Sequence, residues 1–490
     1  MGLRASLAPP EAPRPAWRWH DPRWMSLPVS AFTRGDRRME AENYLTSGFG
    51  VRVAIEARKA GLTCLGEVAR VWQPSRLKGI QVSREFGTPF LAATQLFDLR
   101  PVPRKWLSID RTHESADRFV TRGSILVTCS GNVGRATLAR QVHEGVLVSH
   151  DLLRIEASAP EWWGWIYAYL RAAQVREMLK TVQYGHIIKH LETTHLNVLP
   201  IPKLRDDLLA DFGAKALQIT RLRDQAEERV TVAENHFEGC IGRVDAKDLG
   251  EGGFSVKASS IFEGRRRIDA SVHNPAVTKV RRHLKRNGQG VTRLGDLGFD
   301  CWLPTRFKRV PAEDGAELMD SSDLFEINPD GGRVIADGDF GDPHRGRVEP
   351  GWLLVARSGQ AYGLNGSITV ATAAHQGKVI SDDIIRVAPR TSAAIPVGYL
   401  FVALSHPTLG RPLVKSIIYG SSIPHLEVTD LQDLPVVRLA VADETRIADL
   451  ADQASASWAE ADLLEQGIAR EASDLIDRFI AGQKAFLAED

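Results

Sequence analysis

The sequence predicts a mixed α/β protein that contains two copies of one domain, each followed by a long amphipathic helix. Three observations lead to this fold class. Blocks of similar sequence recur about 230 positions apart in the 490-residue chain. Short apolar runs typical of strands alternate with helix-like segments within each copy. A long segment with apolar residues three and four positions apart follows each copy.

The repeated blocks stay in register along most of the chain. Gly123–Gly131 (GSILVTCSG) matches Gly351–Gly359 (GWLLVARSG) at an offset of 228 positions. A period of this length indicates a duplicated domain, because the repeats of solenoid proteins are only about 20–50 residues long. Two further pairs keep nearly the same offset: Val148–Ile155 with Ile380–Val387 (232), and Tyr184–Glu192 with Tyr419–Glu427 (235).

Each copy contains strand-like, turn-like and helix-like segments in the same order. The apolar runs predict strands at 124–128 and 146–148 in copy one, and at 353–356 and 379–380 in copy two. Ser130-Gly131-Asn132 and Ser358-Gly359-Gln360 are typical of turns that follow a strand. Helix-like spacing covers 165–182 and 399–417, and Pro407 and Pro412 are expected to interrupt the second segment.

The two long helices have heptad-like apolar seams. The first covers about 204–238, and the second has the same spacing from Ile447 to Leu475. Each helix could pack on its own copy, or the two could form an antiparallel intramolecular coiled coil about 50 Å long that separates the copies. Their equal position after each copy favours the coiled coil. The predicted segments are 1–42 (N-terminal extension), 43–203 (first copy), 204–241 (central helix), 242–272 (linker), 273–438 (second copy) and 439–490 (C-terminal helix).

The charges cancel over the whole chain but separate when the helices are considered alone. Lys and Arg number 62 against 61 Asp and Glu, which gives a net charge of +1. Residues 204–238 carry −3 and residues 441–490 carry −8, which leaves +12 on the remainder. Because DNA attracts basic surfaces, this division favours two DNA-facing copies and an acidic spacer.

Several protein classes are disfavoured by features that the sequence lacks. The four cysteines are widely spaced and form no C-x-x-C pair, which argues against a disulfide framework or a zinc ribbon. No apolar run approaches the ~20 residues of a membrane span, so we expect a soluble, cytoplasmic protein without a membrane partner. The chain contains no phosphate-binding loop, no G-x-S-x-G elbow and no H-E-x-x-H pair.

Acids and histidines that recur in both copies allow two interpretations. The acids could form the carboxylate set of a metal-dependent nuclease, or they could cap helices and pair with Arg154 and Arg386. The second interpretation is favoured, because no nucleophile or metal partner lies at motif spacing. We therefore expect no catalytic residue and no metal ligand, and we expect the histidines to maintain the fold. The recurring residues are Asp151, Asp383, Glu192, Glu427, His190 and His425.

Taken in order, these blocks resemble the specificity (S) subunit of type I restriction–modification enzymes. With the two helices, the resemblance covers most of residues 43–483. The chain departs from the pattern in its first 40 or so residues, at Lys189, where copy two has Pro424, and at Gly134 and Gly363, which are one position out of register. The resemblance is carried by 123–134, 149–155 and 184–200 in copy one, and by 351–363, 381–387 and 419–435 in copy two.

The resemblance implies two target-recognition domains, each reading one half of a bipartite, asymmetric DNA sequence. The antiparallel helices would separate the half-sites by about one turn of double-stranded DNA, roughly 34 Å. Two methyltransferase subunits would dock on the helices and flip an adenine out of each half-site, using S-adenosylmethionine that they bind and this chain does not. A restriction or translocating subunit, or another phage-defence effector, could join a complex in which this chain is non-catalytic.

Direct readout requires polar or basic side chains that reach the base edges. Ser130 and Ser358 could equally serve the structure of their turns. Two other functions stay open from the sequence: a metal-dependent nuclease that cuts DNA unaided, and a transcriptional regulator that binds a bipartite operator. The candidate DNA-binding residues are Lys78, Arg84, Thr94, Gln95, Ser130, Asn132 and Arg135 in copy one, and Arg306, Lys308, Arg309, Ser358 and Gln360 in copy two.

Overall fold

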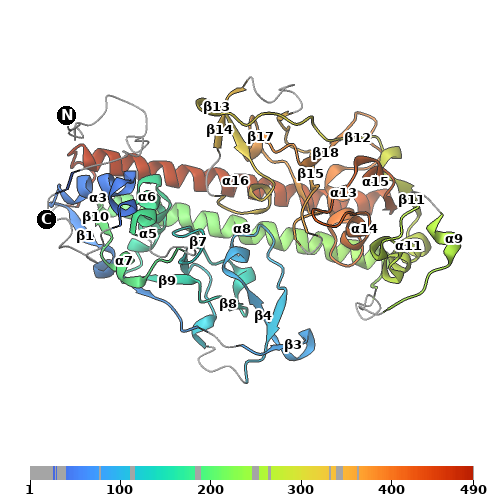
Figure 1. Cartoon of the computed structure of the whole chain (residues 1–490), viewed down its shortest axis with the longest axis horizontal. Coiled ribbons are helices and arrows are strands. Elements are labelled where there is room, and N and C mark those ends of the chain that lie inside the picture. The colour runs from blue at the N-terminus through green and yellow to red at the C-terminus, as the bar shows by residue number, and fades with distance from the viewer. Residues whose placement is uncertain are drawn as a thin grey trace. The chain divides into compact units, whose positions relative to one another are not determined.

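The protein consists of two compact units, each with one copy of the repeat and parts of both long helices (Figure 1). Unit 1 comprises residues 1–221 and 461–490, and unit 2 comprises residues 222–460. The structure is a computed structural model, and it describes residues 26–27, 29, 40–76, 79–110, 116–182, 189–244, 253–262, 266–329, 333–337, 346–360 and 363–488.

Unit 1 contains a four-stranded main sheet and a small sheet of shorter strands. The main sheet has the order β2 (Ala69–Trp72), β9 (Leu152–Ala157), β6 (Ile125–Thr128) and β7 (Ala136–Leu138). The small sheet has the order β3 (Gln81–Val82), β5 (Lys105–Leu107), β4 (Thr88–Leu91) and β8 (Leu147–Val148). A ribbon pairs β1 (Leu62–Cys64) with β10 (Pro200–Pro202). All four residues of β6 are buried, which explains why its sequence is a continuous apolar run.

Unit 2 repeats this arrangement. Its main sheet has the order β12 (Phe299–Trp302), β18 (Ile384–Pro389), β15 (Leu353–Ala356) and β16 (Ile368–Val370). Its small sheet has the order β14 (Arg333–Ile335), β13 (Pro311–Met319) and β17 (Val379–Ile380). A ribbon again pairs β11 (Gly290–Arg293) with β19 (Pro435–Arg438). The strands predicted from the apolar runs are confirmed as β6, β8, β15 and β17.

The duplication extends to the register of individual strands. In unit 1, Leu126 of β6 is opposite Arg154 of β9, and in unit 2 the residues 228 and 232 positions later, Leu354 and Arg386, are opposite each other. The small sheets also agree, since β4 pairs with β8 and β13 pairs with β17 in parallel. This shared register confirms that each unit contains the same fold.

The helix-like segment 165–182 forms two helices rather than the single one expected. They are α5 (Trp162–Arg171) and α6 (Ala173–Val182), and Ala172 between them is extended, with ψ of 139°. The side chain of Ser473 accepts a hydrogen bond from the backbone N–H of Ala173 at 3.3 Å, and Gln174 donates to Ser473 O at 3.0 Å. The side chain of Ser473 therefore satisfies the Ala173 N–H, which a continuous helix would have bonded internally, and the Gln174 side-chain amide adds a second contact to the same residue.

In copy two, the corresponding segment forms α13 (Val397–Ser405) and α14 (Arg411–Ser416). Pro407 lies between the helices, as predicted. Pro412 does not interrupt a helix but lies in the first turn of α14, where its missing N–H has no helical partner to lose.

Shorter helices complete the two units. Asn274 caps α11, because its Oδ1 accepts a hydrogen bond from the Ala276 N–H at 2.9 Å, and Pro275 begins that helix. None of the described helices combines the length and the apolar character needed to cross a membrane. The shorter helices are α2 (Glu42–Leu45), α3 (Ser47–Glu56), α4 (Leu65–Val68), α7 (Thr193–Asn197), α9 (Ala258–Ile261), α10 (Ala270–His273), α11 (Pro275–Asn287) and α15 (Val428–Gln432).

The long helices α8 (Asp206–Ile241) and α16 (Val441–Ile480) pack against each other within each unit. In unit 1, Lys215 Nζ lies 2.5 Å from Glu471 Oε2. In unit 2, Arg229 Nη1 donates to Ser457 Oγ at 2.5 Å, and His236 Nε2 lies 2.9 Å from Asp443 Oδ1. Residue numbers rise along α8 while those of their partners fall along α16, so the helices are antiparallel as predicted.

Both long helices also pack on the copies. Packing of the helices on each other and packing on the copies, which were two alternatives from the sequence, therefore both occur. In unit 1, the ring of Trp165 in α5 lies 5.0 Å from that of Phe212 in α8. Tyr167 of α5 donates a hydrogen bond to Glu465 Oε1 of α16 at 2.6 Å. In unit 2, the rings of Phe401 in α13 and Trp458 in α16 are 6.4 Å apart.

Two glycines at equivalent positions permit this close packing. A Cβ atom at Gly164 of α5 would overlap the backbone of Gly213 and Phe212 in α8. A Cβ atom at Gly398 of α13 would lie 2.7 Å from the carbonyl oxygen of Ala448 in α16. In each unit, a helix of the copy therefore touches a long helix backbone to backbone, with no room for a side chain.

We predict that Gly164→Ala and Gly398→Ala each lower the free energy of unfolding by about 1–3 kcal/mol, because the added methyl group forces the helices apart. Urea unfolding followed by circular dichroism measures the change. The matched control is Gly467→Ala in α16, where a Cβ atom meets nothing within 4 Å. There, the better helix propensity of alanine should stabilise the protein by up to about 1 kcal/mol. Equal stability of all three variants would contradict the packing described here.

Candidate nucleic-acid interface

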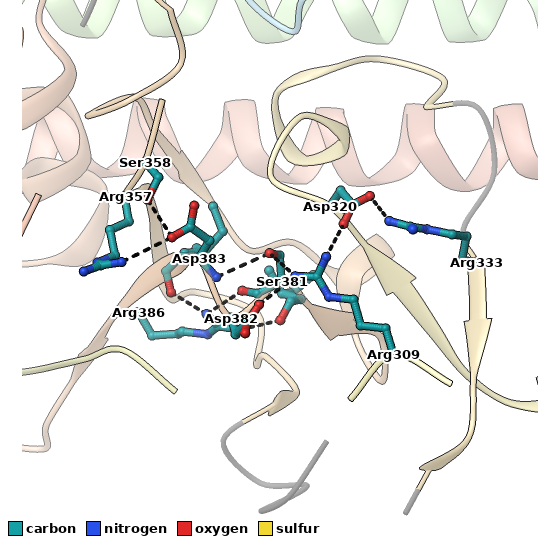
Figure 2. Close-up of polar contacts among 11 residues, drawn as sticks. Arg309, Asp320, Arg333, Arg357, Ser358, Ser381, Asp382, Asp383 and Arg386 are labelled. Carbon is teal, nitrogen blue, oxygen red and sulfur yellow. Dashed lines mark hydrogen bonds and ion pairs between the residues drawn. The ribbon is translucent and has the colours of Figure 1, made fainter. Parts of the chain in front are cut away.

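A buried arginine fixes the turn between the small sheet and the main sheet of unit 2 (Figure 2). Arg386 of β18 has 0% exposure. Its guanidinium donates to the carbonyl oxygens of Ile380 at 2.7 Å and Ser381 at 2.9 Å, and also to that of Ile384. Ile380 ends the small-sheet strand β17 and Ile384 begins the main-sheet strand β18. One side chain therefore holds the two sheets together at their junction.

Arg154 has the same role in unit 1, where it is 2% exposed. It donates to Leu152 O at 2.7 Å, and to Val148 O and Ser149 O at 3.5 Å each. These carbonyls belong to the end of β8, the turn and the start of β9. The junction is thus a property of the repeated fold.

The expectation that Arg154 and Arg386 pair with the recurring acids is wrong, since their hydrogen bonds go to main-chain carbonyls. The pKa of Arg154 is lowered to about 10 and that of Arg386 to about 9, mainly because both groups are buried away from water. Both values lie above neutral pH, so both groups remain charged. Carbonyl oxygens compensate part of the cost of burying each cation.

The recurring acids in unit 2 bind neighbouring side chains. Ser358 Oγ donates to Asp383 Oδ1 at 2.7 Å and lies 2.6 Å from His425 Nδ1. Arg357 donates to Glu427 Oε1 at 2.9 Å, at the N-terminal end of α15. These contacts connect the turn after β15 with the segment before α15.

In unit 1, the equivalent groups make some of the same kinds of contact. Asp151 accepts a hydrogen bond from Ser149 Oγ at 3.0 Å, and Glu192 lies at the N-cap position of α7. Ser130 and His190 form an isolated β-bridge, as Ser358 and His425 do in unit 2. Among the described residues, none of the recurring acids belongs to a group of three side chains close enough to share a metal ion.

A cluster of arginines and aspartates lies where the small sheet of unit 2 meets the turn at Ser381 (Figure 2). Arg309 donates to Asp382 Oδ1 at 2.6 Å, to Ser381 Oγ at 3.2 Å and to Asp320 Oδ1 at 3.4 Å. Arg333 of β14 also pairs with Asp320. The carboxylates orient both guanidinium groups and reduce the net charge of the cluster.

The most accessible of the predicted DNA-binding residues lie next to the small sheets. Arg306 and Lys308 are exposed on the segment before β13. Neither side chain makes a hydrogen bond or an ion pair with the described residues. Arg84 is exposed before β4, with its guanidinium 5.8 Å from the ring centroid of Trp106. Thr94 is exposed on the turn after β4. These side chains are available to a nucleic acid.

The structure adds a basic pair that the sequence analysis did not identify. Lys105 of β5 is opposite Phe90 of β4, and Arg333 of β14 is opposite Leu318 of β13. Lys105 and Arg333 are 228 positions apart in the sequence, and so are the residues opposite them, Phe90 and Leu318. Lys105 and Arg333 therefore occupy the same place in the two small sheets, and both are exposed. The offset of the first repeated block would have found this match.

Two other predicted residues are buried. Gln95 is 8% exposed, and its amide accepts from Ala92 N at 3.1 Å and donates to Val102 O at 2.7 Å. Arg135 is 9% exposed, with its guanidinium 4.0 Å from the ring centroid of Phe97. The structure assigns both to the packing of copy one and does not favour a base contact for either. Lys78 lies outside the described residues, as do Tyr184 and Gly185.

The remaining candidates lie on the turns after β6 and β15. Asn132 is exposed and its Oδ1 accepts from Arg176 at 2.9 Å, while Gln360 is exposed and donates to Ser422 O at 3.2 Å. Ser130 and Ser358 are half-buried in the contacts described above. The hydrogen bonds of Ser358 and the β-bridge of Ser130 support the structural alternative for the two serines and leave the base contacts as predictions.

The turns also correct one detail of the alignment between the copies. Gly134 has φ of +80° and its N–H donates to Thr128 O at 2.7 Å. In copy two the same conformation and hydrogen bond belong to Gly366, with φ of +74° and a 2.7 Å bond to Ala356 O, and not to Gly363. The turn of copy two is longer by four residues, which is why the offset changes from 228 to 232.

Helix α11 carries five exposed basic residues within its 13 positions. Its apolar side is buried through Val277, Val280 and Leu284. The helix lies at the start of copy two, and its counterpart at the start of copy one, α3, has a single basic residue, Arg52. Its exposed basic residues are Lys279, Arg281, Arg282, Lys285 and Arg286.

Structure comparison finds this chain similar to S subunits of type I restriction–modification systems over most of its length. The S subunit from M. genitalium matches 88% of this chain and 96% of its own, with 12% identity and a TM-score of 0.30. The HsdS subunit from Thermoanaerobacter tengcongensis matches 86% and 97%, with 14% identity and a TM-score of 0.24. A structure concerning complex assembly and conformational transition of the type I R-M system gives the same values. No protein-family model and no curated protein sequence matches the chain.

We predict that removing the buried cation of Arg386 lowers stability, whereas removing the exposed cation of Lys308 weakens DNA binding. Arg386→Met should lower the free energy of unfolding by about 2–4 kcal/mol, because the carbonyls of residues 380, 381 and 384 lose their donors. Lys308→Met should change stability by less than about 0.5 kcal/mol but weaken binding to a random-sequence duplex and reduce the salt dependence of log K by about one unit. Urea unfolding and fluorescence anisotropy at several salt concentrations measure the two effects. Unchanged DNA binding by Lys308→Met would remove it from the interface.

Proposed function

We propose that this protein is the DNA-recognition subunit of a type I restriction–modification or related methylation-linked defence complex. The observation that supports the proposal most strongly is the duplicated junction of main and small sheet, with an exposed basic residue, Lys105 or Arg333, at the same place in each copy. Two equivalent basic surfaces suit a bipartite target, because each can bind one segment of the phosphate backbone.

In this proposal, each copy reads one half of an asymmetric site. The exposed candidates Arg84 and Thr94 serve one half, and Arg306 and Lys308 serve the other. Specificity comes from contacts to base edges, whereas the basic groups mainly position the protein on the phosphates. The copies need not read the same bases, because their turns differ in length and their exposed residues differ in type.

The helices α8 and α16 act as the spacer between half-sites and as the docking surface for two methyltransferase subunits. Their 36 and 40 residues correspond to about 54 and 60 Å of helix. The net negative charge of both segments disfavours binding of these helices to DNA. The methyltransferases supply S-adenosylmethionine and the adenine chemistry, a restriction or translocating subunit can join, and the complex acts in the cytoplasm. This chain contributes recognition and assembly, not catalysis.

The proposal is tested by mapping methylated adenines across the genome of cells with and without this gene. A bipartite methylated motif should disappear with the gene and return with the intact copy. Replacing residues 273–438 with the corresponding segment of a relative should change one half of the motif and leave the other half and the spacer unchanged, because each copy reads independently.

Three results would contradict the proposal. A motif altered in both halves would show that the copies do not read separately. Metal-dependent cleavage of DNA by the purified chain alone would favour a nuclease. An unchanged methylation map, together with binding to a bipartite promoter sequence, would favour a transcriptional regulator.

We also predict that lengthening both helices lengthens the recognised spacer. Inserting one heptad after Arg221 in α8 and one before Ala461 in α16 adds about 10.5 Å, or about 3 base pairs, and keeps the apolar seam in phase. Methylation mapping should show both half-sites unchanged and the gap wider. Insertion in one helix alone is the control and should abolish methylation by shifting the seam. An unchanged gap in the double insertion would mean that the helices do not set the distance.

A further inference from the structure

A histidine, a cysteine and an aspartate converge in unit 2, where the end of α8 meets the start of α16. His236 and Cys240 lie one helical turn apart on α8, which places both side chains on one side of the helix. Asp443 lies in the first turn of α16. One ligand atom from each of the three residues lies within 4.8 Å of the other two.

The three side chains are partly exposed, so an ion in solution can reach them. The side chain of His236 is 24% exposed and that of Asp443 is 38% exposed, and Cys240 is half-buried. None of the three belongs to the small sheets or to the turns proposed to contact DNA. The group is therefore separate from the recognition surface.

The donor set favours a zinc-like cation over a hard one. An imidazole nitrogen, a thiolate sulfur and a carboxylate oxygen are the three ligand types that Zn²⁺ uses in proteins. Mg²⁺ and Ca²⁺ prefer oxygen ligands, and a thiolate selects against them. Three protein ligands leave a fourth tetrahedral position for water.

The geometry needs only a small adjustment to hold such an ion. Zn–N and Zn–O bonds of about 2.0–2.1 Å and a Zn–S bond of about 2.3 Å place tetrahedral ligand atoms about 3.3–3.6 Å apart. His236 Nε2 and Asp443 Oδ1 are already 2.9 Å apart. The other two separations are at most 4.8 Å, so atomic shifts of about 1 Å separate the present arrangement from tetrahedral ligand spacing.

We propose that His236, Cys240 and Asp443 form a binding site for Zn²⁺ or a similar divalent transition metal. The ion ties the last turn of α8 to the first turn of α16. This proposal does not depend on the DNA-recognition function, because it concerns only the packing of two helices within unit 2.

The proton balance of binding follows from the contacts in the structure. Without the ion, His236 Nε2 and the Cys240 thiol both face the Asp443 carboxylate, and burial followed by Asp443 raises the pKa of that thiol. On binding, the thiol proton leaves to the solvent, and the neutral imidazole binds the metal through Nε2 in the tautomer that carries its proton on Nδ1. One Zn–S, one Zn–N and one Zn–O bond form, and nothing is oxidised or reduced.

The test is a titration of the full-length, chelator-treated chain with Zn²⁺, followed by calorimetry, and with Co²⁺, followed by absorption spectroscopy. We expect one ion per chain, a thiolate-to-cobalt charge-transfer band, and a thermal midpoint that rises with Zn²⁺ concentration because the ion binds only the folded state. Cys240→Ser and Asp443→Asn should each weaken the affinity on the order of 100-fold and remove or reduce the cobalt band.

Cys64→Ser is the matched control, because Cys64 is another half-buried thiol, located in unit 1. This variant should keep the affinity, the stoichiometry and the cobalt band of the wild type. Circular dichroism of each variant without metal establishes that it is folded, and Asp443→Asn preserves the shape of the side chain if Cys240→Ser unfolds. Wild-type stoichiometry below one ion per chain, or equal affinity in Cys240→Ser and the wild type, would show that the three residues form only a hydrogen-bonded group.

Discussion

The buried guanidinium groups of Arg154 and Arg386 are the interaction on which each copy depends. Each joins the end of a small-sheet strand to the start of a main-sheet strand through carbonyl oxygens. A buried cation is costly unless its donors are satisfied, so the turn around it has little freedom to move. The position of the small sheet, and of the basic residues on it, follows from this constraint.

The two copies share this scaffold and differ where they meet solvent. The order of the main sheet and the parallel pairing within the small sheet are the same. The connection from β15 to β16 is longer than that from β6 to β7, and the small sheet has three strands in the described part of unit 2 and four in that of unit 1. A fixed core with variable turns is the arrangement expected of two modules that bind different sequences with the same framework.

The near-zero net charge of the chain is explained by its organisation. The segments that become α8 and the C-terminal region are acidic, and the remainder is basic. In unit 2, carboxylates such as Asp320 and Asp382 also hold Arg309 in a defined orientation. The basic surface is thus smaller than the charge count of the copies indicates. Arg306, Lys308 and the exposed side of α11 remain as its most accessible part.

The sequence by itself determined the duplication, the strands β6, β8, β15 and β17, and the two long antiparallel helices, because periodicity and repeated blocks are local patterns. It did not reveal the break at Ala172, since the groups that stabilise it come from Ser473, about 300 positions away. The sequence also could not show that Gln95 and Arg135 are buried while candidates such as Arg84 and Thr94 are exposed, because all are polar side chains of the expected type. The 228-position offset makes Lys105 and Arg333 equivalent, but only strand register and burial showed that both are exposed at the same place in their small sheets. The approach of Asp443 to His236 and Cys240 required the tertiary structure, because helix packing brings together residues that lie far apart in the sequence.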